Sequence, residues 1–206
     1  MAPLLSMLFP VIASTYVLIN GTSTVHYVEH FLLHERISPA PLAGLKIWDR
    51  EVADWRAPTT SERVARPTVT VLHLWSYYCT PCLAELPQVV KWAQRQEQEG
   101  KGAVRVLVVA HDTDGANMRS KWPVFSTGLP SMAALYQDPS GDFFGSIARK
   151  APATNRPPLP LTVVLDKNFS IQYAIAGPLQ GRFNELSDSI ARFHESELAP
   201  QLQASR

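Results

Sequence analysis

Two cysteines separated by two residues, Cys79 and Cys82, are the side chains best suited to chemistry in this sequence. The nearly continuous apolar run before them, residues 69–75, predicts a buried strand that is covered on both faces. After a short turn, Thr80 is a suitable helix cap, and Pro81 fits the first helical position, where a missing N–H costs nothing. Cys79 would then lie at a helix N-terminus, whose partial positive charge favours a thiolate. Cys82 follows one turn later and could resolve a mixed disulfide formed at Cys79, so the pair predicts disulfide exchange.

Composition excludes several other classes of protein. A chain of 206 residues with 46% hydrophobic residues is expected to form one domain with additional segments. The net charge is +1 and the basic residues are scattered, so no nucleic-acid partner is expected. The sequence has two cysteines, which excludes a framework of structural disulfides. A structural zinc site usually needs four ligands, and there is no second cysteine pair to complete one.

The block WSYYCTPCLAELP, residues 75–87, resembles the active-site block of the TlpA-like (ResA-type) thioredoxins. These are extracytoplasmic thiol-disulfide oxidoreductases and include reductants of cytochrome c maturation. Their block has aromatic residues before the first cysteine, and an acidic residue and a proline after the second. Tyr78 stands where tryptophan is usual, and it keeps an aromatic wall beside the sulfur.

The resemblance extends over about residues 45–195 and implies an α/β thioredoxin-like fold. A mixed central sheet would be flanked by helices. An N-terminal hairpin would precede the cysteine strand, and an inserted unit would lie between the second strand and a cis-proline strand.

The resemblance also assigns roles to individual residues. Cys79 would be the nucleophile and Cys82 the resolving thiol. Glu85 should lie about one turn after Cys82 on nearly the same helix face. The resemblance favours a carboxylate that adjusts the thiol pKa values or relays a proton, and it would raise those pKa values if it is buried and charged nearby. The alternative for Glu85 is an ordinary solvated helix residue.

The segment LPLTVVLD, residues 159–166, resembles the family strand whose first proline is cis and faces the cysteines. We assign that proline to Pro160 because it directly precedes the predicted strand, although Pro157 and Pro158 compete. The substrate groove is expected to be lined by Trp75, Tyr77, Tyr78, Thr80, Pro81 and Leu159.

The N-terminal segment, residues 1–37, is expected to be an export signal or membrane anchor followed by a juxtamembrane helix. Residues 2–19 are almost wholly apolar, although they lack a basic start and are slightly shorter than the roughly 20 residues of a transmembrane helix. A buried or partner-covered helix is the alternative. His26, His30 and His34 share one side of the following helix, as in a metal-binding stripe, but no carboxylate or cysteine completes a site, so a polar helix face is favoured.

The remaining chain is divided into a thioredoxin-like domain at 38–198 and a tail at 199–206. His111 follows the second strand; we interpret it as a loop histidine, although it could approach the cysteines. The elements expected are strands near 45–48 and 51–55, a helix through Glu99, a second strand at 104–110, a helix near 116–122, an extended piece at 134–137, a turn at 138–141, a helix near 143–150, a strand at 170–175 and a helix at 179–198.

The leading prediction is an extracytoplasmic thiol-disulfide oxidoreductase, membrane-anchored through its N-terminal segment. No organic cofactor or metal is expected, because electrons pass between sulfurs. Partners would be protein thiols or disulfides, apocytochrome c among them, and a membrane electron-donor protein. Family analogy favours a reductant. The cysteine spacing does not give the direction of electron flow, because potentials for such pairs span about −270 to −120 mV.

Two rival functions remain open. The first is a disulfide oxidase or isomerase of the same fold. The second is a non-catalytic copper(I)-binding or partner-binding module, since two thiolates suit copper(I). Copper-delivery proteins of this fold carry a CxxxC spacing instead of the CxxC found here.

Overall fold

A computed structural model describes residues 36–37, 44–49, 51–52, 54–59, 67–99, 103–111, 135–148 and 159–204, with side chains described through residue 195. Several predictions lie outside these residues. They are the N-terminal apolar segment, the stripe of His26, His30 and His34, the helix near 116–122 and the competing prolines Pro157 and Pro158. The division into domain and tail also stays a prediction.

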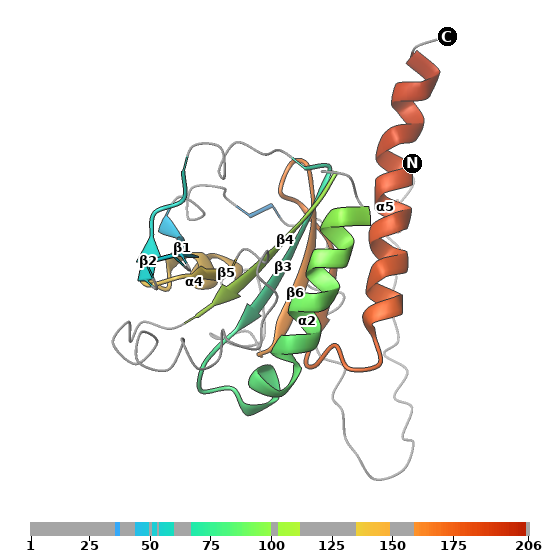
Figure 1. Cartoon of the computed structure of the whole chain (residues 1–206). Coiled ribbons are helices and arrows are strands. Elements are labelled where there is room, and N and C mark those ends of the chain that lie inside the picture. Colours follow the sequence, from blue (N-terminus) through green and yellow to red (C-terminus); the bar gives the residue numbers. More distant parts are fainter. Residues whose placement is uncertain are drawn as a thin grey trace, which may run out of the picture.

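The described strands form one mixed, seven-stranded sheet in the order β2-β1-β5-β4-β3-β6-β7 (Figure 1). Neighbours β3, β4 and β5 are parallel, and β6 runs antiparallel to β3. The strands are β1 (Lys46–Asp49), β2 (Asp54–Arg56), β3 (Val69–Trp75), β4 (Val104–Ala110), β5 (Leu135–Gln137), β6 (Leu161–Asp166) and β7 (Ile171–Ala176).

The central strand β3 is buried along its whole length, as its apolar run predicts. Its alternate residues point to opposite faces of the sheet. Val69, Val71 and Trp75 belong to the core under α2, and Leu72 and Leu74 belong to the core on the other face. The predicted burial on both faces is confirmed, and the turn after β3 is carried on a strand that cannot shift without disturbing two cores.

Two long helices, α2 (Thr80–Glu99) and α5 (Phe183–Ala204), lie side by side on one face of the sheet (Figure 1). The Trp92 indole N–H donates to the Ser187 hydroxyl at 3.0 Å and joins them. The short helix α4 (Asp142–Ala148) contributes Phe143 and Ile147 to the opposite core. The expected mixed sheet with helices on both faces is therefore confirmed.

Most expected elements are present within the described chain, with shifts at their ends. The hairpin strands β1 and β2 pair antiparallel, and β3 pairs with β4 in parallel. The prediction for the last helix is wrong at both ends. It begins four residues later, because residues 180–182 form a turn with Gly181 at φ 79°, and it continues to Ala204. Residues 201–204 are good helix formers, although the apolar spacing used for the prediction ends before them.

Candidate active site

Cys79 and Cys82 are joined by a disulfide, with their Cα atoms 5.2 Å apart. They lie where β3 ends and α2 begins. Cys79 is partly exposed, whereas Cys82 is fully buried, so a partner molecule can reach only the first sulfur directly. This asymmetry is what an attacking and a resolving cysteine require.

Cys79 itself occupies the N-cap position of α2, and the prediction that Thr80 caps the helix is wrong. The Cys79 carbonyl accepts the Leu83 N–H at 3.1 Å, which is the first hydrogen bond of the helix. The Cys82 N–H points to the Cys79 sulfur at 3.3 Å. Thr80 and Pro81 thus fall in the first turn, where the missing N–H of Pro81 still costs nothing. The sulfur takes the place of a capping oxygen, so the helix N-terminus acts directly on Cys79.

A turn based on Ser76 positions the first cysteine. The Ser76 hydroxyl accepts the Tyr78 N–H at 3.2 Å, and its carbonyl accepts the Cys79 N–H at 3.0 Å. Tyr77 and Tyr78 meet edge to face, and Tyr78 is 67% exposed. Trp75 is only 1% exposed and packs in the core under α2, so it lies beneath the site and does not form part of its surface.

Pro160 stands at the same edge of the sheet as the cysteine turn. Leu161 pairs with Leu74 in the antiparallel ladder of β6 and β3, which places Pro160 level with the end of β3. The Leu159–Pro160 peptide bond is cis. Leu159 is partly exposed and packs against the same core as Cys79. Thr80 and Pro81 are exposed beside the first cysteine.

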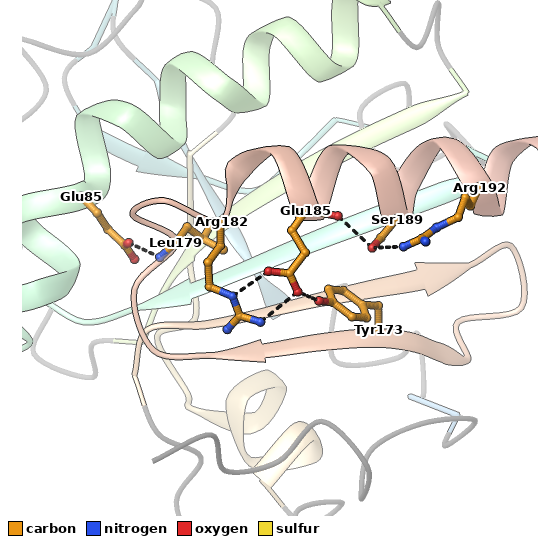
Figure 2. Close-up of polar contacts among 7 residues, drawn as sticks. All are labelled: Glu85, Tyr173, Leu179, Arg182, Glu185, Ser189 and Arg192. Carbon is orange, nitrogen blue, oxygen red and sulfur yellow. Dashed lines mark hydrogen bonds and ion pairs between the residues drawn. The ribbon is translucent and has the colours of Figure 1, made fainter. Parts of the chain in front are cut away.

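Glu85 is a buried carboxyl one helical turn after Cys82, which excludes the solvated helix residue that the sequence left open. Its Oε2 accepts the backbone N–H of Leu179, in the loop before α5, at 2.6 Å (Figure 2). Burial raises the pKa of Glu85 from 4.5 to about 7, and the Leu179 hydrogen bond opposes this rise. The group can therefore gain or lose a proton near neutral pH.

His73 was missed by the sequence reasoning and lies beside Glu85. Its ring is fully buried, its Nδ1 is 3.0 Å from the Thr162 hydroxyl, and its Nε2 is 3.7 Å from Glu85 Oε1. Burial lowers the pKa of His73 from 6.5 to about 3, so the ring is neutral and the contact with Glu85 is not an ion pair. The signal for His73 was its place two residues before Trp75, on the helix-facing side of the strand.

His111 directly follows β4 at the same sheet edge, and its backbone N–H donates to the Trp75 carbonyl at 2.7 Å. Its ring stacks on Phe144 of α4 at a centroid distance of 4.0 Å. The ring therefore packs against α4, the helix that covers the opposite face of the sheet from α2.

No protein-family model matches the sequence, and no curated protein is a significant match. Solved structures do align with it. A candidate protein disulfide isomerase from Bacteroides thetaiotaomicron aligns with a TM-score of 0.50 and 18% identity, over 68% of this chain and 81% of that one. The fold is thioredoxin-like.

Two further structures are similar at lower scores. StoA from Bacillus subtilis aligns with a TM-score of 0.49 and 16% identity, over 72% of this chain and 97% of its own. A candidate thioredoxin from Neisseria meningitidis aligns with a TM-score of 0.48 and 20% identity, over 73% of this chain and 87% of its own. The closer kinship with TlpA-like proteins stays a prediction.

Within this thioredoxin-like fold, the described residues contain no group of three or more metal-ligating side chains. None of the described helices is long and apolar enough to cross a membrane. The chemistry that the described site offers is that of a disulfide at a helix N-terminus, above a buried carboxyl and a neutral imidazole.

Proposed function

We propose that this chain is a thiol-disulfide oxidoreductase that exchanges the Cys79–Cys82 disulfide with protein partners outside the cytoplasm. The observation that carries the proposal is the unequal exposure of two bonded cysteines at the start of α2. A partly exposed sulfur that caps a helix is activated and accessible. The buried Cys82 sulfur, one turn later, is protected from partners and can react only with the Cys79 sulfur.

In the reducing direction, the Cys79 thiolate attacks a disulfide of the partner. The partner's S–S bond breaks, one of its sulfurs leaves as a thiolate, and the other is joined to Cys79. The Cys82 thiolate then attacks the Cys79 sulfur and releases the partner's second thiolate. Two electrons pass to the partner, and the Cys79–Cys82 disulfide is formed without an organic cofactor or a metal.

Glu85 would receive and return the proton of the buried thiol, because it is the carboxyl that lies one turn from Cys82 on the inner face of α2. Leu159, supported by the buried cis Pro160, would form one side of the groove for the partner's chain, and Tyr77, Tyr78, Thr80 and Pro81 the other. Trp75 would support this groove from below.

Family resemblance favours a TlpA-like reductant with apocytochrome c thiols among its substrates, fed by a membrane electron-donor protein and anchored by the N-terminal segment. Analogy alone supports these finer points. The reduction potential tests the direction. Equilibration with glutathione or dithiothreitol, followed by mass-tag alkylation, should give a value well below about −200 mV for a reductant, whereas a value near −120 mV would identify an oxidant.

A matched pair of variants tests the roles of the two cysteines. Cys79→Ser should abolish reduction of a disulfide substrate such as insulin. Cys82→Ser should instead accumulate a mixed disulfide between Cys79 and the substrate, visible on a non-reducing gel. Retained activity in Cys79→Ser would overturn the proposal, and stoichiometric copper(I) binding by a reduced protein without reductase activity would favour the metal-binding rival.

A further inference from the structure

Two buried polar atoms face each other beneath the disulfide. His73 Nε2 and Glu85 Oε1 are 3.7 Å apart, and neither has a hydrogen-bond partner among the described residues. Buried polar atoms are rarely left unpaired, and such a pair calls for an explanation. The gap is roughly 0.8 Å longer than an ordinary N–H···O hydrogen bond, so a small side-chain movement closes it.

The contacts on either side hold these two groups in line. The Leu179 N–H fixes one carboxyl oxygen of Glu85 and leaves the other directed at His73. Thr162, which pairs directly with His73 across β3 and β6, places its hydroxyl 3.0 Å from the ring Nδ1.

A hydroxyl can both donate and accept, so Thr162 suits either tautomer of the ring. When Nδ1–H donates to Thr162, Nε2 is free to accept a hydrogen bond from protonated Glu85. When Thr162 donates to Nδ1, Nε2–H can donate to ionised Glu85. The arrangement therefore matches the carboxyl in both of its protonation states.

We propose that His73 is a positioning residue that shares one exchangeable proton with Glu85, and that this pair takes the proton of Cys82 during disulfide exchange. The inference rests on the proposed function. The Cys82 S–H bond breaks and its proton moves to the Glu85 carboxylate. The neutral His73 ring changes tautomer in this step, losing a proton at Nε2 and gaining one at Nδ1, so that Nε2 accepts a hydrogen bond from the carboxyl. The Cys82 thiolate forms the bond to Cys79, and the partner's sulfur leaves with the electron pair. In the reverse direction the proton returns to Cys82.

Other ionisable groups near these elements are directed elsewhere. Glu97 lies about three turns further along α2 and accepts the Val106 N–H at 2.9 Å. Asp138 is buried, but its carboxyl accepts the Phe144 N–H at the start of α4, in the core on the opposite face. Around the pair, β6 presents Thr162 and the loop before α5 presents the Leu179 N–H. The two thiols of the reduced protein are then the ionisable groups whose protonation is expected to depend on the His73–Glu85 pair.

The test follows the second step of exchange directly. Reduced full-length protein is mixed with 5,5′-dithiobis(2-nitrobenzoate), which places one thionitrobenzoate on Cys79. Attack by Cys82 releases it, and stopped-flow absorbance gives the rate at each pH. His73→Leu should move the midpoint of this pH–rate profile upward by about one pH unit, because the ionised carboxylate loses a charge-assisted hydrogen bond that is stronger than the neutral one.

The controls separate a shared proton from a packing effect. In a Glu85→Gln background, His73→Leu should produce no further shift. His194→Leu, which changes a partly exposed histidine of α5, should leave the midpoint in place. His73→Gln, whose amide can donate and accept, should shift the midpoint less than His73→Leu and serves as the test if the leucine variant does not fold.

The outcomes are distinguishable. If wild-type protein releases no second thionitrobenzoate at any pH, the proposed disulfide exchange fails. If wild-type protein releases it but the His73 variants keep the wild-type midpoint, or shift it equally with and without Glu85, the shared proton is overturned. The ¹³C shift of the Glu85 carboxyl in oxidised protein gives the same pKa change without any turnover.

Discussion

The Glu85 carboxyl experiences two opposed influences. Removal from water raises its pKa, and the hydrogen bond from the Leu179 N–H lowers it. Burial is the larger effect, and the resulting pKa of about 7 is near the pH at which an acid–base group works best. A side chain that would be ionised on a helix surface is thereby near the midpoint of its titration at neutral pH, one helical turn after Cys82.

This shift makes the stability of the folded protein depend on pH. The folded-state pKa of about 7 is above the unfolded value of 4.5. The stabilising contribution of Glu85 to the free energy of unfolding is therefore fully present below pH 4.5 and is lost as the pH rises through 7. Glu85→Gln removes the dependence while keeping an acceptor for Leu179. We expect the free energy of unfolding of the variant to rise relative to wild type between pH 4.5 and pH 8, by up to roughly 3 kcal/mol.

Urea unfolding of the oxidised proteins at the two pH values measures this change. Glu99→Gln is the matched control, because Glu99 is an exposed carboxyl on the same helix. That control should not reproduce the pH-dependent change expected for Glu85→Gln. An equal difference between Glu85→Gln and wild type at both pH values would contradict the prediction.

At the scale of elements, α2 connects the site to the rest of the fold through its whole length. Its first turn holds the disulfide, its second turn holds Glu85, and Trp92 further along joins it to α5. A second network fastens the start of α5 to β7, because Glu185 accepts hydrogen bonds from both Arg182 and the Tyr173 hydroxyl (Figure 2). These contacts hold the loop that presents the Leu179 N–H to Glu85.

The Trp92–Ser187 hydrogen bond allows the contact between α2 and α5 to be measured. Ser187→Ala leaves a buried indole N–H unpaired and should lower the free energy of unfolding by about 1–3 kcal/mol. In a Trp92→Phe background there is no N–H to leave unpaired, so the same serine change should cost much less. Urea unfolding of the two single variants and the double variant gives the coupling. Strictly additive costs would show that the hydrogen bond does not join the helices.

Across the whole molecule, the sequence predicted what depends on local pattern. The apolar runs of β3 and β4 and the proline before β6 are sufficient to predict the central strands of the sheet and the position of the cysteine turn. The apolar run of β3 hides the role of His73, although its alternation with Val71 and Trp75 directs it toward α2. The Leu179 N–H could not be predicted, because it is 94 residues from Glu85 and only the complete fold brings them together.

The same architecture predicts that reduction of the disulfide leaves the molecule as a whole unchanged. Cys79 and Cys82 are only three residues apart, so the bond closes a very short loop and constrains little of the unfolded chain. On the chain-entropy estimate it contributes about 2 kcal/mol to the free energy of unfolding. The ladders of β3, β4 and β6 and the two cores do not include the S–S bond, so we expect them to persist when it is reduced.

Amide hydrogen exchange of the oxidised and reduced proteins measures this directly. The largest change should fall on the Cys82 and Leu83 amides, which donate to the Cys79 sulfur and carbonyl and depend on the geometry of the first turn. The slowest amides of β3 report global unfolding and should lose no more than roughly 30-fold in protection, the equivalent of about 2 kcal/mol. A larger loss spread over β7 and α5 would mean that the redox state controls the packing of the whole domain. Disulfide exchange would then affect partners through a change in the conformation of the domain, and not only through the local change at Cys79.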